Sequence, residues 1–500
     1  MSNATQIHLA VDLGASGGRV VAGLFDGQRL TLEEVHRFEN GGITMNERMY
    51  WDVLALWSRI TEGLRAAATK YGERIVSVGV DTWGVDFGLL GRNNELIGFP
   101  YHYRDRRTTG LMPRAFEKMS RDEIFAETGL QFMELNTLYQ MIAMRWEDSP
   151  LLEMAQSFLM MPDLFHFFLS GEKSNEFTNS TTTQFFNPRL HNWADNVLQR
   201  FDLPRRIFGD IVEPGTKLGR LRPPVAEQTG LRNVDVILPG THDTASAVMS
   251  VPAASQPGQQ PDWCYISSGT WSLMGVEVPS PIVNDRCREL NFTNEGGVGK
   301  TTRLLKNIAG LWVVQECRRM WRLAGREYTW DHLVDLAHQA PPLVSLINPD
   351  HPSFVAPRDM TAAIREFCQS TGQVVPSSEG AIIRCALESL ALRYRVVLEW
   401  LEELVGNSIR TIHIVGGGTQ NRLLCQMAAD ACGRQVVAGP IEATAIGNAM
   451  MQVVASGQVQ SIAAAREVIR RSFYVEQYDP KNEGPWDDAY QRFVKLLQAK

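Results

Sequence analysis

Apolar runs of strand length, separated by turn residues, recur along the chain. The first half holds such runs at residues 7–13, 19–25, 30–38, 75–80 and 85–90. The pair Asp26-Gly27 between the second and third runs is typical of a hairpin turn. Residues 52–71 instead carry apolar side chains at helical spacing. The predicted order, three strands, a helix and further strands, indicates an α/β layer structure.

The second half repeats the opening theme. Apolar residues 263–266 and 271–276 flank the small-residue turn 267–270, much as strands flank the turn 15–18. This similarity predicts two related halves. Further along, the pattern predicts these elements: a helix over 379–404 capped by Ser378, a strand over 410–415, and helices over 420–431 and 441–454.

The segment 253–262 is rich in Pro, Gln and Gly and reads as a linker of unknown role. It divides the chain into domains at 1–252 and 262–460. A tail, 461–500, follows; it ends in an amphipathic helix and is expected to pack on the domains.

Composition narrows the class of protein. The 500 residues are 44% hydrophobic and 21% charged, as in an ordinary folded protein with a large core. The net charge of −7 argues against non-specific nucleic-acid binding. The sequence contains neither a signal peptide nor an apolar run long enough for a membrane span, which predicts a cytoplasmic protein. A monomer is compatible with the sequence, which does not fix the oligomeric state.

The seven cysteines all lie in the second half and contain no CxxC pair, which favours buried thiols over zinc or redox chemistry. Whether Cys368 and Cys385, or Cys425 and Cys432, form disulfides stays undecided, because spacing alone does not show that two cysteines are bonded.

Residues 12–19 (DLGASGGR) are the first candidate site. Small residues on a hairpin let backbone N–H groups approach a phosphate, and Asp12 at the strand end could hold Mg²⁺ through water. A plain tight hairpin is the competing interpretation. A Rossmann site is disfavoured, since the motif is not GxGxxG and no helix follows directly.

Residues 240–246 (GTHDTAS) follow a strand-like run and are the second candidate. Asp243 at a strand-to-helix junction could accept a proton from an incoming hydroxyl. Spacing alone favours the alternative, a helix N-cap.

Two glycine-rich segments need separate interpretations. Residues 416–421 (GGGTQN) offer a flat surface for a planar base, or a sharp turn. Residues 296–302 (GGVGKTT) imitate a phosphate-binding P-loop, but Asn294 stands where that motif requires glycine. A hairpin tip carrying a solvated Lys300 is favoured over the P-loop of a partition-type ATPase.

Residues 81–86 and 103–108 set polar groups beside aromatic ones, which suits a sugar but is by itself uninformative. Together with other stretches, these motifs resemble the FGGY carbohydrate kinases over nearly the whole chain. The matching stretches include AVDLGASGGRV (10–20), VDTWGVDFGLL (80–90), YRDRRT (103–108), GTHDTASAV (240–248), SSGTWSLMG (267–275), NFTNEGG (291–297), LLKNIAGLW (304–312) and IVGGGTQN (414–421). DTWGVDF, THDTASA and TNEGG resemble the branch that acts on L-rhamnulose.

The resemblance implies a fold of two ribonuclease-H-like domains, as in actin and sugar kinases, around a central cleft. The N-terminal domain would bind sugar and the C-terminal domain ATP, without a Walker lysine. It implies ATP- and Mg²⁺-dependent phosphorylation of L-rhamnulose at the 1-hydroxyl, in L-rhamnose breakdown. Asp12 would position Mg²⁺ through water.

The resemblance also assigns residues to each substrate. Asp243 would be the general base, and the sugar pocket would be lined by Gly84, His242, Asp243, Thr244 and Asn307. The ATP phosphates would be met by Ala15, Ser16, Gly17, Gly18, Arg19 and Thr270, and the nucleoside by Gln315 and Gly417. Many members of this branch have serine where this chain has Gly17, but the backbone donors that bind phosphate are still present here.

Two alternatives stay open at the sequence level. The chain could phosphorylate another acceptor, such as L-fuculose, L-xylulose or glycerol. It could also be a nucleotide-switched chaperone or filament subunit of the same fold.

Overall fold

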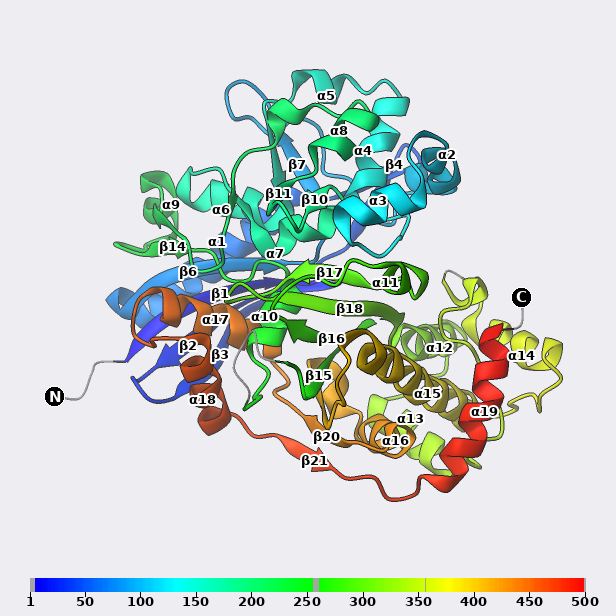
Figure 1. Cartoon of the computed structure of the whole chain (residues 1–500). Coiled ribbons are helices and arrows are strands. Elements are labelled where there is room, and N and C mark those ends of the chain that lie inside the picture. Colours follow the sequence, from blue (N-terminus) through cyan, green and yellow to red (C-terminus); the bar gives the residue numbers. More distant parts are fainter. Residues whose placement is uncertain (1–4, 255–259, 356, 499–500) are drawn as a thin grey trace. The chain divides into compact units, whose positions relative to one another are not determined.

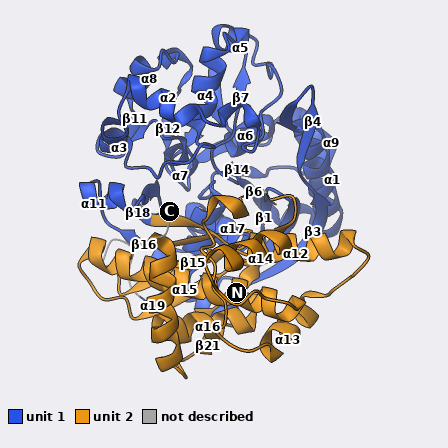
Figure 2. Ribbon diagram, turned by 90° about the vertical axis from the view of Figure 1, so that its right-hand side faces the viewer, with its two compact units in different colours: residues 1–259, 277–304, 443–473 blue, residues 260–276, 305–442, 474–500 orange. Residues whose placement is uncertain are grey.

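The computed structural model describes residues 5–254, 260–355 and 357–498 (Figure 1). The chain forms two compact units, and each unit is built from three separate segments (Figure 2). The first unit comprises 1–259, 277–304 and 443–473, and the second comprises 260–276, 305–442 and 474–500. Residues 255–259 of the predicted linker lie outside the described residues.

The first unit is organised around a sheet with strand order β13-β14-β6-β1-β2-β3. Its strands are β1 (Gln6–Leu13), β2 (Gly17–Phe25), β3 (Leu30–Glu39), β6 (Ile75–Thr82), β13 (Lys217–Arg220) and β14 (Asp235–Ile237). Strands β1, β2 and β3 form the antiparallel meander predicted from the apolar runs, while β6 and β14 run parallel to β1 and β6, respectively.

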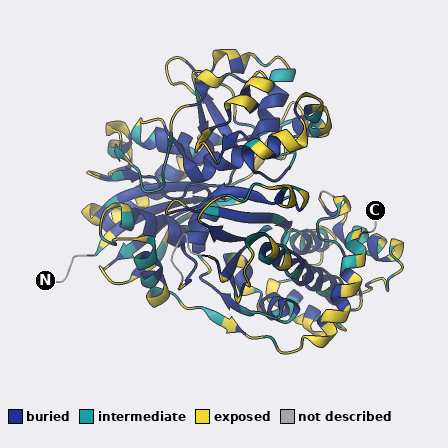
Figure 3. Ribbon diagram, viewed as in Figure 1, coloured by how far each residue is buried: buried dark blue, intermediate teal, exposed yellow. Residues whose placement is uncertain are grey.

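Both faces of this sheet are covered, so its central strands are buried (Figure 3). Alternate residues of β1 point to opposite faces. Leu9 and Val11 pack with Ile60 of helix α1 (Val53–Tyr71), which begins one residue later than the predicted helix 52–71 because Asp52 is its N-cap. Ala10 packs with Ala445 of helix α17 (Ala443–Ala455) from the third segment. Helix α17 therefore fixes the face opposite α1.

A buried polar seam joins α17 to this sheet. Asn448 Nδ2 donates to Asp81 Oδ2 at 2.6 Å, and Gln452 Nε2 donates to Asn448 Oδ1 at 2.7 Å. Ser77 Oγ donates to Gln452 Oε1 at 2.6 Å and lies 2.6 Å from His8 Nδ1. His8 therefore donates from Nδ1, and burial lowers its pKa to about 4.

Helix α10 (Asp243–Met249) packs closely on α17. A Cβ added to Gly447 would lie 1.8 Å from the carbonyl oxygen of Ser246, so only glycine permits this approach. The helix that begins at Asp243 is thereby seated on the helix of the polar seam.

The expected strand 85–90 begins later than predicted. Val85 adopts φ +68°, a left-handed conformation that interrupts a strand. Strand β7 (Phe87–Leu90) therefore starts after it and pairs with β8 (Ser157–Met160), outside the main sheet. An unpredicted hairpin, β4 (Gly42–Met45) and β5 (Arg48–Trp51), precedes α1.

The rest of the first unit is mostly short elements. They are α2 (Leu111–Lys118), α3 (Arg121–Thr128), α4 (Thr137–Trp146), α5 (Pro150–Met154), α6 (Met161–Ser170), β9 (Asn175–Glu176), α7 (Phe177–Ser180), β10 (Phe186–Asn187), β11 (Asn192–Trp193), α8 (Asp195–Arg200), β12 (Ile211–Val212), α9 (Pro223–Thr229), α11 (Asp285–Glu289), β17 (Thr293–Gly296) and α18 (Ile462–Ser472).

The second unit contributes to a sheet with the strand order β17-β18-β16-β15-β19-β20-β21, in which residues 277–278 of β16 and 302–304 of β18 belong to the first unit. Its elements are β15 (Trp263–Ser268), β16 (Trp271–Val278), β18 (Thr302–Ala309), α12 (Trp312–Leu323), α13 (Trp330–Gln339), α14 (Met360–Ser370), α15 (Glu379–Val405), β19 (Thr411–Val415), α16 (Arg422–Cys432), β20 (Gln435–Ala438), β21 (Glu476–Tyr478) and α19 (Gly484–Gln498). Ser378 Oγ caps α15 as predicted, accepting from Ala381 N. Helix α19 packs on α15 and α16.

All seven cysteines are buried free thiols, including both pairs left open by the sequence. Among the described residues, each helix is too short or too polar to cross a membrane.

Candidate active site

The loop that leads into α10 is anchored on two sides. Thr82 N, at the end of β6, donates to Thr241 O at 2.9 Å. Thr241 donates from N at 3.1 Å and from Oγ1 at 2.5 Å to one carboxylate oxygen of Glu176, which is fully buried. His242 N donates to Thr178 Oγ1 at 3.1 Å. These bonds fix the backbone immediately before Asp243.

Asp243 is the first residue of α10, and His242 is the residue at the N-cap position. The cap interpretation of Asp243 is therefore wrong. Its Oδ1 accepts from Thr244 N at 2.6 Å and from Thr244 Oγ1 at 3.2 Å, and His242 Nε2 lies 3.4 Å away. One third of the side chain, 33%, is exposed. Oδ1 is held by the protein, so Oδ2 is the oxygen available to a substrate.

Carboxylates gather around this residue. Burial, together with the nearby charge of Asp12, raises the pKa of Asp243, and the proximity of His242 opposes that rise. Asp12 at the end of β1 pairs with Arg19 Nη2 at 2.7 Å, and it faces Asp81 in the register of β1 and β6. Burial, and then the charge of Asp12, raise the pKa of Asp81 well above its usual range. The site concentrates negative charge that a cation would offset.

The β1–β2 hairpin has the tight geometry expected of a phosphate-binding turn. Gly14 N donates to Gly17 O at 2.8 Å, and Asn40 Nδ2 donates to Gly14 O at 2.8 Å. Ser16 at the tip is exposed. A Cβ added to Gly17 would lie 3.4 Å from Phe38 O, an ordinary contact, so the missing serine of the resemblance is not excluded by packing.

Gly84 lies on a strained turn between β6 and β7. The turn is held by Thr182 Oγ1, which accepts from Val85 N at 2.9 Å, and by Thr137 Oγ1, which donates to Val85 O at 2.6 Å. A β-branched residue at positive φ is costly and persists only where neighbours fix it. This strain coincides with the position that the resemblance places in the sugar pocket.

Beside Gly84, a carboxylate organises a cluster of aromatic rings. Asp86 Oδ2 accepts from Trp51 Nε1 at 2.6 Å, Trp83 Nε1 at 3.0 Å and Tyr103 N at 3.1 Å. Trp51 stacks on Trp83 with ring centroids 3.9 Å apart, and on His102 at 4.1 Å. Burial raises the pKa of Asp86 to about 6. The sequence placed Trp83 here but gave no sign that Trp51 and His102 join it.

From the roles that the resemblance implies, we expect Asp86→Asn to raise the KM for the sugar by about tenfold while the KM for ATP changes less than about twofold. An amide keeps one acceptor oxygen but turns an NH₂ group toward N–H donors, so the ring cluster loses its order. Steady-state kinetics with each substrate varied in turn check this. Asp202→Asn, at an exposed position of the same unit, is the control. Equal changes in both KM values would contradict the assignment.

In the second unit the structure brings together two predicted nucleotide-side residues. Thr270 Oγ1 donates to Gln315 Oε1 at 3.2 Å, and Trp312 N donates to Thr270 O at 3.1 Å. The β15–β16 turn is thus seated on the first turn of α12. Asn307 lies half-buried on β18.

The third glycine of the triplet after β19 is needed for packing. A Cβ on Gly418 would lie 2.0 Å from Ser268 Oγ, whereas one on Gly417 would meet nothing within 4 Å. Gly417 is exposed. The turn therefore presents its middle residue outward beside β15, as a surface for a flat base requires.

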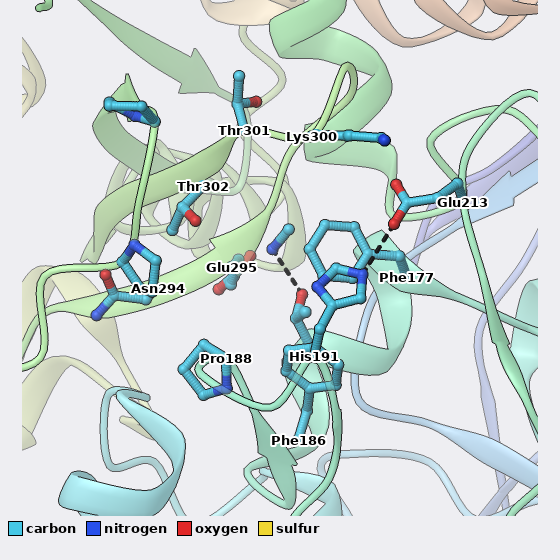
Figure 4. A pocket seen from close by; sticks show the side chains of 14 residues that line it. Phe177, Phe186, Pro188, His191, Glu213, Asn294, Glu295, Lys300, Thr301 and Thr302 are labelled. Carbon is cyan, nitrogen blue, oxygen red and sulfur yellow. Dashed lines mark hydrogen bonds and ion pairs between the residues drawn. The ribbon is translucent and has the colours of Figure 1, made fainter. Parts of the chain in front are cut away.

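The segment 296–302 is a hairpin and not a P-loop. Gly297 N donates to Thr301 O at 2.8 Å, strand β18 follows directly, and Lys300 is exposed at the tip. Lys300 also borders a pocket of about 370 Å³ in the first unit, together with Glu295, the paired His191 and Glu213, and Phe177 (Figure 4). The solvated lysine interpretation is confirmed.

Among the described residues, no three His, Cys, Asp or Glu side chains meet in a geometry that could hold a metal ion by themselves. Asp12 nevertheless fits a hydrated magnesium ion, because its hard carboxylate oxygens are the donors that Mg²⁺ prefers. Next to Asp12, the buried Oδ1 of Asp81 has no hydrogen-bond partner among the described residues.

Comparison with known proteins identifies the class. The structure matches gluconate kinase from Lactobacillus acidophilus with a TM-score of 0.80 at 14% identity, covering 99% of this chain and 97% of that one. It matches Plasmodium falciparum glycerol kinase with a TM-score of 0.77 at 12% identity, covering 99% and 97%. The fold is that of the two-domain sugar kinases.

Sequence comparison then gives the family. The C-terminal domain model of the FGGY family of carbohydrate kinases matches residues 264–456, and the N-terminal domain model matches 7–250. A rhamnulokinase from Bacteroides thetaiotaomicron is 44% identical over 493 residues, covering 99% of this chain and 100% of the relative. One from Oceanobacillus iheyensis is 40% identical, covering 95% and 98%. The chain belongs to the FGGY family and is a carbohydrate kinase.

Proposed function

We propose that this enzyme transfers the γ-phosphoryl group of ATP to the 1-hydroxyl of L-rhamnulose, giving L-rhamnulose 1-phosphate and ADP. Near full-length relatives named rhamnulokinase, at 37–44% identity, support this choice of substrate. The position of Asp243, with Oδ1 held and Oδ2 available, is the observation that carries the mechanism.

In the proposed reaction, Asp243 Oδ2 takes the proton of the sugar's 1-hydroxyl, and the oxygen of that hydroxyl attacks the γ-phosphorus. The bond from phosphorus to the β,γ-bridging oxygen breaks, and ADP leaves with that electron pair. Proton removal and positioning are the main tasks of the protein in such a transfer. His242 and Thr244 hold the base, and the aromatic cluster around Asp86 packs against the sugar's C–H face.

We propose that the remaining residues bind the nucleotide. Ala15, Ser16, Gly17, Gly18 and Arg19 meet its phosphates from the first hairpin, Thr270 meets them from the β15–β16 turn, and Gln315 and Gly417 border the nucleoside. Asn307 contributes to the sugar pocket. Asp12 would hold Mg²⁺ through water, and the ion would supply charge neutralisation on the phosphates.

The domain assignment belongs to the same proposal. Residues 1–252 supply the sugar side, 262–460 the ATP side, and 461–500 a tail on the domains. The enzyme acts on a small molecule in the cytoplasm, as a monomer.

ADP release with Mg-ATP against a panel of L-rhamnulose, L-fuculose, L-xylulose, D-xylulose and glycerol tests the proposal. We expect L-rhamnulose to stimulate turnover at least about tenfold more than any other acceptor, because a site built to pair with a substrate's hydroxyls rejects sugars that misplace them. Preference for another acceptor would overturn the proposed substrate but leave the proposed role of Asp243 as the general base in place. Slow ATP hydrolysis that no acceptor stimulates would instead favour the nucleotide-switch alternative.

A further inference from the structure

A buried charged pair lies directly behind His242, and the proposed reaction gives it no role. Glu295 of β17 and Arg303 of β18 stand on the two strands of the hairpin that ends in Lys300. The Arg303 side chain is 0% exposed and that of Glu295 is 7% exposed. Burying two charges is costly, so a pair retained beside a catalytic loop calls for a function.

The pair contacts one ring nitrogen of His242. Glu295 Oε2 lies 3.2 Å from His242 Nδ1, and Arg303 Nη2 lies 3.1 Å from the same atom. Arg303 Nη2 also donates to Glu295 Oε2 at 3.2 Å, and Arg303 Nε donates to Gly296 O at 2.7 Å. The guanidinium is therefore fixed to the hairpin backbone, and with it the carboxylate.

This contact decides which atom His242 presents to Asp243. Nδ1 either accepts from Arg303 or, in the imidazolium, donates to Glu295; both arrangements leave a proton on Nε2. The third arrangement, a neutral ring with its proton on Nδ1, would turn the Nε2 lone pair toward Asp243 Oδ1 at 3.4 Å and is disfavoured by repulsion. Nε2–H thus faces Oδ1 and leaves Oδ2 to the substrate.

We propose that Glu295, fixed by Arg303, is a positioning residue that holds the His242 ring with Nε2–H toward Asp243 and so orients the catalytic base. The inference rests on the proposed role of Asp243 and deepens it. It also gives a function to the Asn-Glu-Gly-Gly stretch, which the sequence resemblance marked without assigning a role to its glutamate.

Glu295 also bears on the charge of the base. Burial alone would raise the pKa of Glu295, but the hydrogen bond with His242 and the charge of Arg303 lower it, so the carboxylate is negative at neutral pH. Glu295 lies 3.2 Å from Nδ1 of this histidine, and the nearby His242 ring opposes the rise in the pKa of Asp243. The other charged groups near Asp243 are Asp12 of β1 and Asp81 of β6, and Arg19 of β2 acts on Asp81.

Glu295→Gln is the main test. It preserves volume but removes the charge, so we expect kcat/KM for the sugar to fall about tenfold or more, mostly through kcat. Because the His242 ring that opposes the rise in the pKa of Asp243 is no longer held in place, the acid limb of the pH profile should move to higher pH. Glu295→Asp, which restores the charge, should return the limb toward the wild-type position.

Glu213→Gln is the matched control. Glu213 also pairs with a histidine of the same unit, His191, at 2.8 Å (Figure 4). Both side chains of this pair are exposed, whereas the bonds of Asp243 go to Thr244 and His242. We expect it to leave both kcat/KM and the pH profile unchanged. Melting temperatures of all variants show whether each is folded at the assay temperature, and Glu295→Asp carries the test if Glu295→Gln is not.

Two outcomes would overturn the proposal. One is a Glu295→Gln enzyme within threefold of wild type with an unmoved acid limb. The other is an equal loss in Glu295→Gln and Glu295→Asp without any shift of the limb, which would mean that Glu295 serves packing alone. If wild type prefers another acceptor, the proposed substrate fails, but the same kinetics on that acceptor still test Glu295.

Discussion

Asp243→Asn is expected to lower kcat by about 10²–10⁴-fold, the range typical of a lost general base, which corresponds to about 3–5 kcal/mol of transition-state stabilisation. The amide keeps an oxygen for Thr244 N, so the first turn of α10 is retained. It places a non-basic NH₂ where Oδ2 accepts the proton. ATP affinity should therefore stay within about twofold, since the loss falls on the chemical step.

The measurement is the rate of ADP release at saturating sugar and ATP, with ATP binding followed separately by calorimetry. Asp202→Asn again serves as the control, because this exposed aspartate lies outside the site. An Asp243→Asn enzyme within threefold of the wild-type kcat would show that another group takes the proton.

Arg466→Met is expected to destabilise the first unit by about 3–5 kcal/mol, the cost typical of removing one member of a buried ion pair. Arg466 of α18 is 1% exposed, and its Nη2 donates to Glu277 Oε2 at 2.6 Å. It also donates to Val248 O of α10 at 3.2 Å. Without Arg466, the carboxyl group of Glu277, which is 3% exposed, loses its ion-pair partner in a buried place.

Thermal and urea unfolding check this prediction, and a melting temperature lower by at least about 5 °C is expected. Arg471→Met is the matched control on the same helix, because Arg471 pairs with Glu467 at 3.3 Å but is 52% exposed. Its effect should stay within about 0.5 kcal/mol. Equal effects of the two substitutions would show that the burial of Arg466 carries no weight.

The sequence predicted the elements whose pattern is local. The runs at 7–13 and 30–38 are strands because apolar side chains recur at strand spacing, and Ser378 caps α15 through a bond that spans only a few residues. The β4–β5 hairpin was missed because β4 is only four residues long and is exposed along its whole length, so Ile43 and Met45 form no buried face. Val85 was assigned to a strand because its propensity is local, whereas its positive φ is imposed by distant Thr137 and Thr182.

The site divides in the same way. The motif around Asp243 marked a candidate base, but local spacing could not distinguish a base from a cap, since the answer depends on which residue begins α10. The resemblance supplied the roles of the motif residues. It assigned no role to Asp86, Glu176 or Glu295, whose importance comes from partners far away in the chain. A single sequence contains no signal for such pairs.

The polar seam beneath α17 allows that helix only one position along the sheet. A slide by one helical turn, about 5.4 Å, would separate Asn448 from Asp81 and Gln452 from Ser77 at the same time. Each buried group left without a partner costs about 1–3 kcal/mol, so intermediate positions are penalised several times over. Apolar contacts alone would tolerate a graded slide. The seam therefore allows one register of α17 on the sheet. The close contact at Gly447 fixes α10, the helix that begins with Asp243, in the same position.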